Sequence, residues 1–103
     1  MRKGACMQKA YCIVNILKIH DEEAFNEYVA GHIPSIEKLD GRFLVMGDRG
    51  EVLEGSWESN LIVIHDFSNI GQFKAWYYSD DYRPWKELRQ SCADVNVILT
   101  KGS

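Results

Sequence analysis

The stretch Ala10–Leu17 reads Ala-Tyr-Cys-Ile-Val-Asn-Ile-Leu, and a second stretch, Leu61–Ile64, reads Leu-Ile-Val-Ile. A strand with one face in water alternates apolar and polar residues, whereas runs like these are typical of strands that are buried on both faces. A chain of 103 residues has room for helices over only one face of such a sheet. We therefore expect a second copy of the chain to cover the other face, with a cleft between the two sheets.

Composition and charge limit the class of protein. The chain is 46% hydrophobic and 12% aromatic, which is typical of a globular domain. Its formal net charge of -3 argues against binding to a phosphate backbone, so we expect no nucleic-acid partner. No apolar run approaches the length of a membrane span, and Asn15 and Lys18 interrupt the stretch that follows the basic N-terminus. We expect no signal peptide, no membrane partner and a cytoplasmic location.

The cysteines and histidines form no recognisable motif. The cysteines are odd in number and lack a C-x-x-C pair, which argues against a disulfide framework and a thiolate zinc site: Cys6, Cys12 and Cys92. We expect Cys12 in a strand core. The histidines lack H-x-x-x-H or H-x-H spacing and are expected to be ordinary surface or interface residues, with no metal bound: His20, His32 and His65. Because no phosphate-cradling glycine loop is present either, we expect no cofactor.

Periodicity and punctuation predict the order of the elements. We expect strands at Ala10–Leu17, Arg42–Met46, Leu61–Phe67 and Val95–Thr100, with a brief extra strand at Glu51–Leu53. A first helix follows the N-cap Asp21, with a kink or break near Ile33 because of Pro34, and ends with Gly41 in a left-handed cap. Ser68 is expected to cap a second helix, and a short third helix carries Pro84 in its first turn.

The order β-α-β-β-α-β is the split pattern of the ferredoxin-like fold, in which an antiparallel sheet carries its helices on one face. The sequence therefore predicts an α+β fold. Residues 1–9 are expected to form an N-terminal leader, and residues 10–103 a single domain.

Polar residues inside apolar strands mark a candidate site. By strand alternation, Tyr11 and Asn15 share one face of the first strand, and Asp66 lies at the end of the third. If these faces coincide, Asp66 lies in a mostly apolar cleft where burial would raise its pKa and suit it to proton transfer. The alternative is that Asp66 hydrogen-bonds neighbouring backbone at the strand end.

An aromatic cluster follows in the second half of the chain: Trp76, Tyr77, Tyr78, Tyr82 and Trp85. Its helical spacing favours core or subunit interface, and a ligand cage is the alternative. Arg89, one helical turn after Trp85, is expected either to pair with Glu54 or to hold a ligand's carboxylate.

These residues carry a resemblance to a known family. The matching elements are Tyr11, Asp21, Tyr28, Pro34, Gly41-Arg42-Phe43-Leu44-Val45, Glu54-Gly55 with Trp57, Ile64 to Phe67-Ser68, Trp76-Tyr77 with Ser79 and Tyr82, and Arg89. From about Tyr11 to Gly102 the chain resembles a bacterial family known as domain of unknown function thirteen-thirty, in the dimeric α/β-barrel superfamily. The chain departs from the family pattern at Asp40, Met46 and His65.

The resemblance implies a homodimer whose facing sheets form a barrel-like interior. Relatives of that fold include cofactor-free monooxygenases, muconolactone-type isomerases, haem-degrading enzymes and plain binding proteins. We expect the chain to bind a small apolar or aromatic metabolite in the cleft, with cofactor-free acid–base chemistry of the isomerase or monooxygenase type. The alternatives are a non-enzymatic regulatory or binding module and a protein that binds haem through His32 or His65.

We assign expected roles on this basis. Asp66 is the expected proton carrier, and Arg42 or Arg89 is the expected anion anchor. The full substrate-binding set that we expect is Tyr11, Asn15, Arg42, Glu54, Trp57, Trp76, Tyr82 and Arg89.

Overall fold

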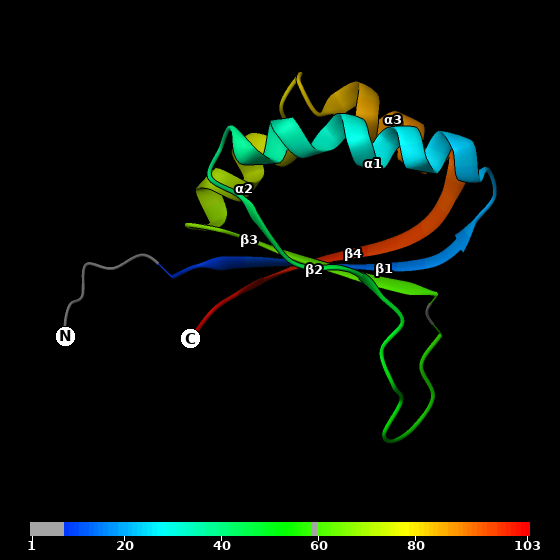
Figure 1. Ribbon diagram of the computed structural model, residues 1–103. Coiled ribbons are helices and arrows are strands. Elements are labelled where there is room, and N and C mark those ends of the chain that lie inside the picture. Colours follow the sequence, from blue (N-terminus) through cyan, green and yellow to red (C-terminus); the bar gives the residue numbers. More distant parts are fainter. Residues whose placement is uncertain (1–7, 59) are drawn as a thin grey trace.

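The computed structural model describes residues 8–58 and 60–103. Within these residues the elements follow in the order β1 (Ala10–Ile19), α1 (Glu22–Glu37), β2 (Arg42–Asp48), β3 (Leu61–Phe67), α2 (Ile70–Tyr77), α3 (Arg83–Cys92) and β4 (Ala93–Lys101). The strands form one antiparallel sheet in the order β2-β3-β1-β4. The helices all lie on one face of this sheet, as Figure 1 shows. The predicted α+β, ferredoxin-like fold is confirmed.

The strand register determines which side chains share a face of the sheet. In the β1–β3 pair, Tyr11 lies opposite Asp66 and Asn15 lies opposite Ile62. Directly opposite residues of an antiparallel pair point to the same face. Here it is the face without helices, because the alternate residues Cys12 and Ile16 lie in the core beneath the helices. We call it the open face and define it by residues from all four strands: Tyr11, Ile13, Asn15, Arg42, Val45, Ile62, Ile64, Asp66, Asn96, Ile98 and Thr100.

The hydrophobic core lies on the other face, between the sheet and the helices. Its buried apolar residues are Ala10, Cys12, Ile16, Phe25, Tyr28, Ile36, Phe67, Phe73, Trp76, Tyr82, Cys92 and Ala93. Cys12 lies in this core as predicted, and burial raises the pKa of its thiol to about 12. The thiol is therefore a small hydrophobic group at neutral pH. Cys6 and most of the expected leader lie outside the described residues.

Helix α1 begins and ends through local hydrogen bonds. The Asp21 carboxylate caps the helix by accepting from the backbone N–H of Ala24 at 3.1 Å, as predicted. Pro34 lies inside the helix without breaking it. The left-handed residue after the helix is Asp40, with φ of 63°, so the prediction that Gly41 takes this conformation is wrong.

Gly41 is required for a different reason. A Cβ atom there would come 2.5 Å from Cγ2 of Ile36 and 2.7 Å from Cε2 of Phe67. The absence of a side chain therefore lets the chain leave α1 and enter β2 directly against the core.

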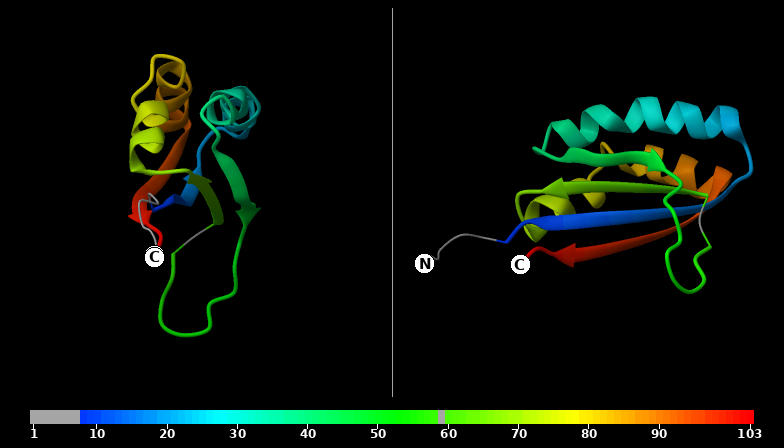
Figure 2. Two further views of the ribbon diagram at one scale, coloured as in Figure 1. Left: turned by 90° about the vertical axis from the view of Figure 1, so that its left-hand side faces the viewer. Right: turned by 60° about the horizontal axis from the view of Figure 1, so that its bottom comes forward.

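Two further local predictions are wrong, and one is confirmed. The N-cap of α2 is Asn69, whose side chain accepts from the N–H of Gln72, and not Ser68. Residues 51–53 form no strand but belong to an exposed loop. This loop, residues 49–58, extends from the sheet on the side of the open face (Figure 2). Pro84 lies in the first turn of α3 as predicted.

Candidate functional site

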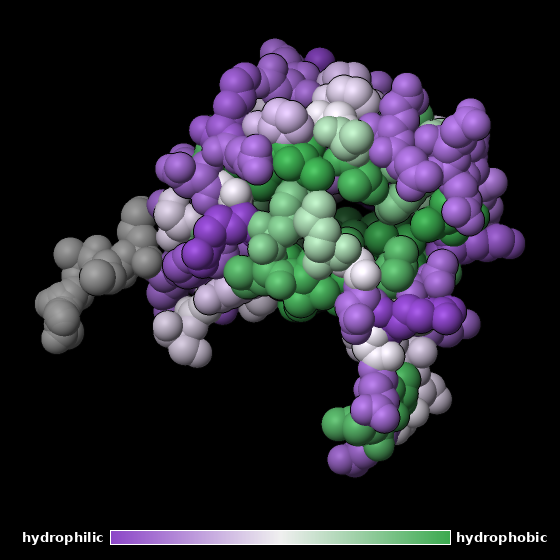
Figure 3. All heavy atoms as spheres, viewed as in Figure 1, coloured by the Kyte–Doolittle hydropathy of each residue, from purple (hydrophilic) through white to green (hydrophobic). Residues whose placement is uncertain are grey.

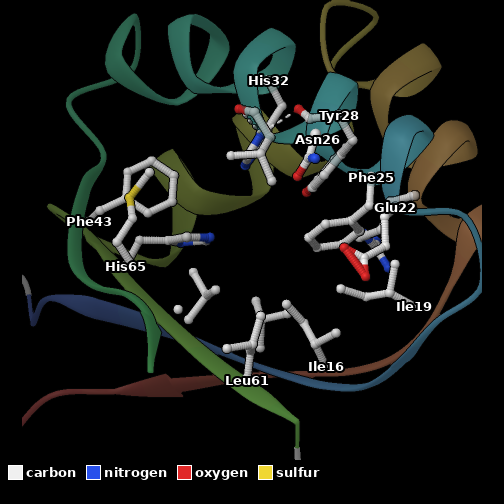
Figure 4. Close-up of a pocket in the computed structure, with 16 residues that line it drawn as sticks. Ile16, Ile19, Glu22, Phe25, Asn26, Tyr28, His32, Phe43, Leu61 and His65 are labelled. Carbon is white, nitrogen blue, oxygen red and sulfur yellow. Dashed lines mark hydrogen bonds between the residues drawn. The ribbon is translucent and has the colours of Figure 1, made fainter. Parts of the chain in front are cut away.

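A cavity of about 300 Å³ lies between α1 and the helix-covered face of the sheet. Its walls are mostly apolar side chains from α1, β1, β2 and β3, as Figure 4 shows. The cavity opens at the surface as a hollow bordered by hydrophobic residues (Figure 3). Its polar lining residues are Glu22, Asn26, Tyr28, His32, His65 and Arg89. A small apolar chamber with few polar groups is the usual form of a small-molecule site.

The cavity is not where the sequence placed the site. We expected a cleft on the open face, between two sheets, lined by side chains from β1 and β3. The cavity formed by the chain itself lies on the opposite face, and none of Tyr11, Asn15, Arg42 and Asp66 lines it. Among the described residues, Arg89 is the one predicted substrate-binding residue that lines this cavity.

Arg89 is a buried cation in the wall of the cavity. Its side chain comes from α3, and the residue is only 5% exposed. The hydroxyl groups of Tyr82 and Tyr28 are the groups that act most strongly on its guanidinium after burial. No carboxylate within the described part of the chain lies at ion-pair distance from it. The alternative pairing with Glu54 is therefore wrong, because Glu54 lies in the exposed loop 49–58.

The two tyrosines beside Arg89 are neutral phenols. Their hydroxyl oxygens lie 2.8 Å apart and share a hydrogen bond. Burial, and then the neighbouring Tyr82, raise the pKa of Tyr28 well above its ordinary value. Burial also raises the pKa of Tyr82. Neither phenol therefore neutralises the charge of Arg89 near neutral pH.

His32 is held in one tautomer by the backbone. Its Nδ1 lies 2.8 Å from the carbonyl oxygen of Tyr28 and 3.0 Å from that of Val29. Carbonyl oxygens only accept hydrogen bonds, so Nδ1 carries the proton and Nε2 carries the lone pair. The ring also stacks on Tyr28, with centroids 4.1 Å apart. Burial is the main cause that lowers the pKa of His32, so the ring is neutral.

His65 is a second neutral imidazole on the opposite wall. It projects from β3 into the cavity, as Figure 4 shows, and is 3% exposed. Burial, and then the nearby His32, lower the pKa of His65 to about 4. Its Nδ1 has no hydrogen-bond partner among the described residues. Its ring packs edge-on against Phe43 and Trp76.

The prediction that the histidines are surface or interface residues is wrong for His32 and His65. His20 does lie at the surface, where its Nε2 is 3.1 Å from a carboxylate oxygen of Asp94. The sequence could have indicated that His65 is buried, because this residue lies within the mostly apolar run Leu61–Phe67. Within residues 8–58 and 60–103, no three potential metal-binding side chains gather in one place.

Asp66 is paired with two cations on the open face. Its carboxylate accepts from Nε and Nη2 of Arg42 at 3.1 and 2.8 Å and from Nζ of Lys9 at 3.1 Å. The hydrogen bond from Arg42 is the main cause that holds the pKa of Asp66 below its ordinary value, against the effect of burial. The predicted increase in this pKa is therefore wrong. The assignment of Asp66 as proton carrier stays a prediction, and an ionised, doubly paired carboxylate gives it no support.

The other predicted residues serve the core, the open face or the loop. Trp76 is buried in the core and donates from Nε1 to Oγ of Ser35 at 2.9 Å. The Nδ2 group of Asn15 donates to the backbone oxygen of Glu58 at 3.0 Å, while its Oδ1 is buried without a partner among residues 8–58 and 60–103. Trp57 lies in loop 49–58 and is 54% exposed.

The fold is shared with proteins of known structure. The RPA0582 protein of unknown function from Rhodopseudomonas palustris is 17% identical, with a TM-score of 0.74 over 93% of this chain and 84% of that protein. SnoaB, a cofactor-independent oxygenase from Streptomyces nogalater, is 9% identical, with a TM-score of 0.72 over 93% and 94% of the two chains. A dimeric ferredoxin-like protein of unknown function from Jannaschia sp. CCS1 is 12% identical, with a TM-score of 0.69 over 91% and 99%. At these identities the similarity shows the fold alone.

Sequence comparison gives the family. No curated protein matches the chain. A family model does match, and it covers residues 9–103, which include every element of the fold. The chain belongs to the family described as Domain of unknown function (DUF1330), in agreement with the resemblance in its sequence.

Proposed function

We propose that the cavity binds a small, largely apolar or aromatic molecule that carries an anionic or ionisable oxygen, and that acid–base chemistry without a cofactor takes place on it. Arg89 is the anchor of that oxygen, with the hydroxyl groups of Tyr28 and Tyr82 beside it. The apolar walls from α1 and the sheet hold the rest of the molecule.

The observation that carries the proposal is the buried guanidinium of Arg89 at an apolar cavity. A buried charge is costly unless it is paired, and two neutral phenols compensate it only in part. A ligand oxygen that bears negative charge would complete the pairing. Guanidinium groups suit this task because they present several donors in one plane.

The fold neighbours are compatible with this chemistry. SnoaB has the same fold and is a cofactor-independent oxygenase, so the fold accommodates a reaction on a small molecule without a bound cofactor. The identity of 9% carries no residue from SnoaB to this chain. The reaction proposed here therefore depends on this chain's own side chains.

We further propose that the chain forms a homodimer through the open face. The central strands β1 and β3 place Ile13 and Ile64 on that face, and Ile98 is 60% exposed on the edge strand β4. Loop 49–58 extends past the same face and carries the exposed side chains of Leu53 and Trp57. A second copy would cover both features, because a two-fold axis brings the same patch of each subunit together. The dimeric neighbour from Jannaschia sp. CCS1 supports this arrangement.

The aromatic cluster gives no support to the alternative of a partner-recruiting module. Trp76 is 2% exposed and packs between helix and sheet, which is a structural role. Trp85 is partly buried and packs its ring against Gly31 of α1. Haem binding stays a prediction, which the absorbance spectrum of a haem titration tests.

A thermal-shift titration with matched probes tests the proposed function. We expect benzoate and phenols to raise the melting temperature, whereas benzyl alcohol, which lacks an acidic group, should have little effect. The variant Arg89→Met should lose the response to benzoate while remaining folded, since replacing a buried charge by a similar apolar group is often neutral for stability.

Arg83→Met is the matched control. Arg83 is on the same helix, but it is exposed and pairs with Asp80 at the surface. This variant should respond to benzoate as the wild type does. An equal response of Arg89→Met and the wild type would contradict the role of Arg89, and no response to any acidic probe would contradict the proposed function.

A further inference from the structure

His32 combines three features that the binding of an anion does not require. It is buried, it is neutral, and its protonated nitrogen is held by two backbone carbonyls. We infer that Nε2 of His32 takes a proton from the bound molecule, and that the ligand is therefore a weak organic acid such as a phenol, an enol or a 1,3-dicarbonyl compound. This inference rests on the proposed binding function and names its ligand class and its base.

The backbone of α1 orients the base. With Nδ1 donating to the carbonyl oxygens of Tyr28 and Val29, the imidazole has one rotamer and one tautomer. Stacking on the Tyr28 ring at 4.1 Å holds the plane of the imidazole. Since His32 lines the cavity, the free lone pair on Nε2 is the acceptor that a ligand proton meets. A fixed acceptor of this kind is the arrangement that general-base catalysis needs.

The charges around His32 explain why the proton must come from the ligand. The groups that face it are Tyr28 on its own helix, Tyr82 and Arg89 from the α3 side, and His65 from β3. Glu22, in the first turn of α1, lines the same cavity. Tyr28 and Tyr82 are neutral, and Arg89 is positive. An imidazolium in the empty cavity would face Arg89, and no carboxylate is among the charges that shift the pKa of His32. When the ligand supplies the proton, its own anion lies in the same cavity and balances the new charge.

The transfer is balanced without any other reactant. The O–H or activated C–H bond of the ligand breaks, and its electron pair stays on the ligand. A new N–H bond forms at Nε2 of His32, so the ligand gains a negative charge and the imidazole gains a positive one. Arg89 then holds the anionic oxygen as a hydrogen-bond donor, together with the one phenol proton that the Tyr28–Tyr82 hydrogen bond leaves free.

His65 completes the wall opposite His32. Its Nδ1 is buried and has no partner among the described residues, so a polar atom of the ligand is the missing partner. Each imidazole disfavours the protonation of the other, so at most one of them accepts a proton from the ligand. His65 thus positions the ligand, and His32 takes the proton.

The probe for this inference is 4-nitrophenol, whose anion absorbs visible light. At a pH below its solution pKa, wild-type protein should convert the bound phenol into the yellow phenolate without releasing a proton to solvent, because His32 keeps it. Calorimetry in two buffers of different ionisation enthalpy measures that release. In His32→Gln, the bound phenol should need a pH at least one unit higher to ionise, and ionisation should release its proton to the buffer.

His20→Gln is the matched control, since His20 lies at the surface beside Asp94 and outside the cavity. It should behave as the wild type does. Should His32→Gln fail to fold, NMR of wild-type protein with nitrogen-15-labelled histidine gives the same answer. Nε2 of His32 should change from an unprotonated to a protonated shift when 4-nitrophenol is added.

The outcomes separate the two proposals. If 4-nitrophenol binds but stays neutral, or ionises with release of its proton to solvent in the wild type, His32 is not the base and the inference fails while the binding function stands. If neither 4-nitrophenol nor benzoate binds in the cavity, the binding function fails first. A phenolate band with proton retention in the wild type, lost in His32→Gln, establishes the inference.

Discussion

The hydroxyl oxygens of Tyr28 and Tyr82 lie 2.8 Å apart inside the protein, although 54 positions separate the two residues in the chain. This hydrogen bond joins the middle of α1 to the residue that precedes α3, and the guanidinium of Arg89 interacts with both hydroxyls. The pair therefore links the two helices at the wall of the cavity. It also keeps a buried positive charge next to neutral donors, which is the basis of the proposed site.

Removing either hydroxyl should destabilise the protein. We expect Tyr28→Phe and Tyr82→Phe each to lower the free energy of unfolding by about 1–2 kcal/mol, because each change leaves the other hydroxyl with one partner fewer. The double variant should lose less than the sum of the two. Urea denaturation of the four proteins measures the coupling, and strict additivity would contradict a shared hydrogen bond.

His65 should make stability depend on pH. Its pKa is about 4 in the folded chain and 6.5 ordinarily, so the unfolded chain binds a proton first as the solution is acidified. The contribution is therefore complete above about pH 6.5 and is lost as the pH falls towards 4, with a total on the order of 3 kcal/mol. Urea denaturation across this range measures it. His65→Leu should show a shallower loss, and an unchanged slope would contradict the assignment.

The variant Asp66→Asn tests whether the open face and the cavity act independently. The change leaves Arg42 and Lys9 without their carboxylate, and we expect a loss of about 1–3 kcal/mol in the free energy of unfolding. Benzoate binding should be unchanged, because Asp66 does not line the cavity. Chemical denaturation and a benzoate titration on the same sample measure both quantities. Loss of binding in a folded variant would instead support the sequence-based role of Asp66.

Ile98→Glu should dissociate the proposed dimer. Ile98 is 60% exposed on the open face, and a carboxylate buried there from each subunit would be strongly unfavourable. Sedimentation equilibrium at micromolar concentration should give the mass of one chain. Tyr78→Glu is the control, since Tyr78 is 68% exposed and follows α2 on the helix layer. A dimer that survives Ile98→Glu would place the interface elsewhere.

Gly31 should tolerate no side chain while Trp85 is present. A Cβ atom at Gly31 would come 2.2 Å from Cη2 of Trp85, so Gly31→Ala should cost about 1–3 kcal/mol. In a Trp85→Ala background the same change should become favourable by about 0.5–1 kcal/mol, because alanine is the better helix former. Thermal unfolding of both pairs of proteins measures the change in sign.

The sequence predicted well what depends on neighbours along the chain. The predicted strand Leu61–Phe67 has the observed boundaries, because a mostly apolar stretch between polar turns is typical of a buried strand. Asp21 was identified as a cap because its role requires only a backbone N–H three residues on. The errors at Ser68 and Gly41 are shifts of one residue, where adjacent polar or small residues compete for the same role.

The sequence by itself determined the elements, their order, the family and the two faces of the sheet, because hydrophobic periodicity and turn residues act over a few positions. Tertiary structure decided where the cavity lies, that Arg89 meets Tyr28 and Tyr82, and that Asp66 is paired with Arg42. It also decided that His32 and His65 share one chamber. These contacts join residues that are distant in the chain, and only the packing of α1 over the sheet fixes their distances, burial and protonation.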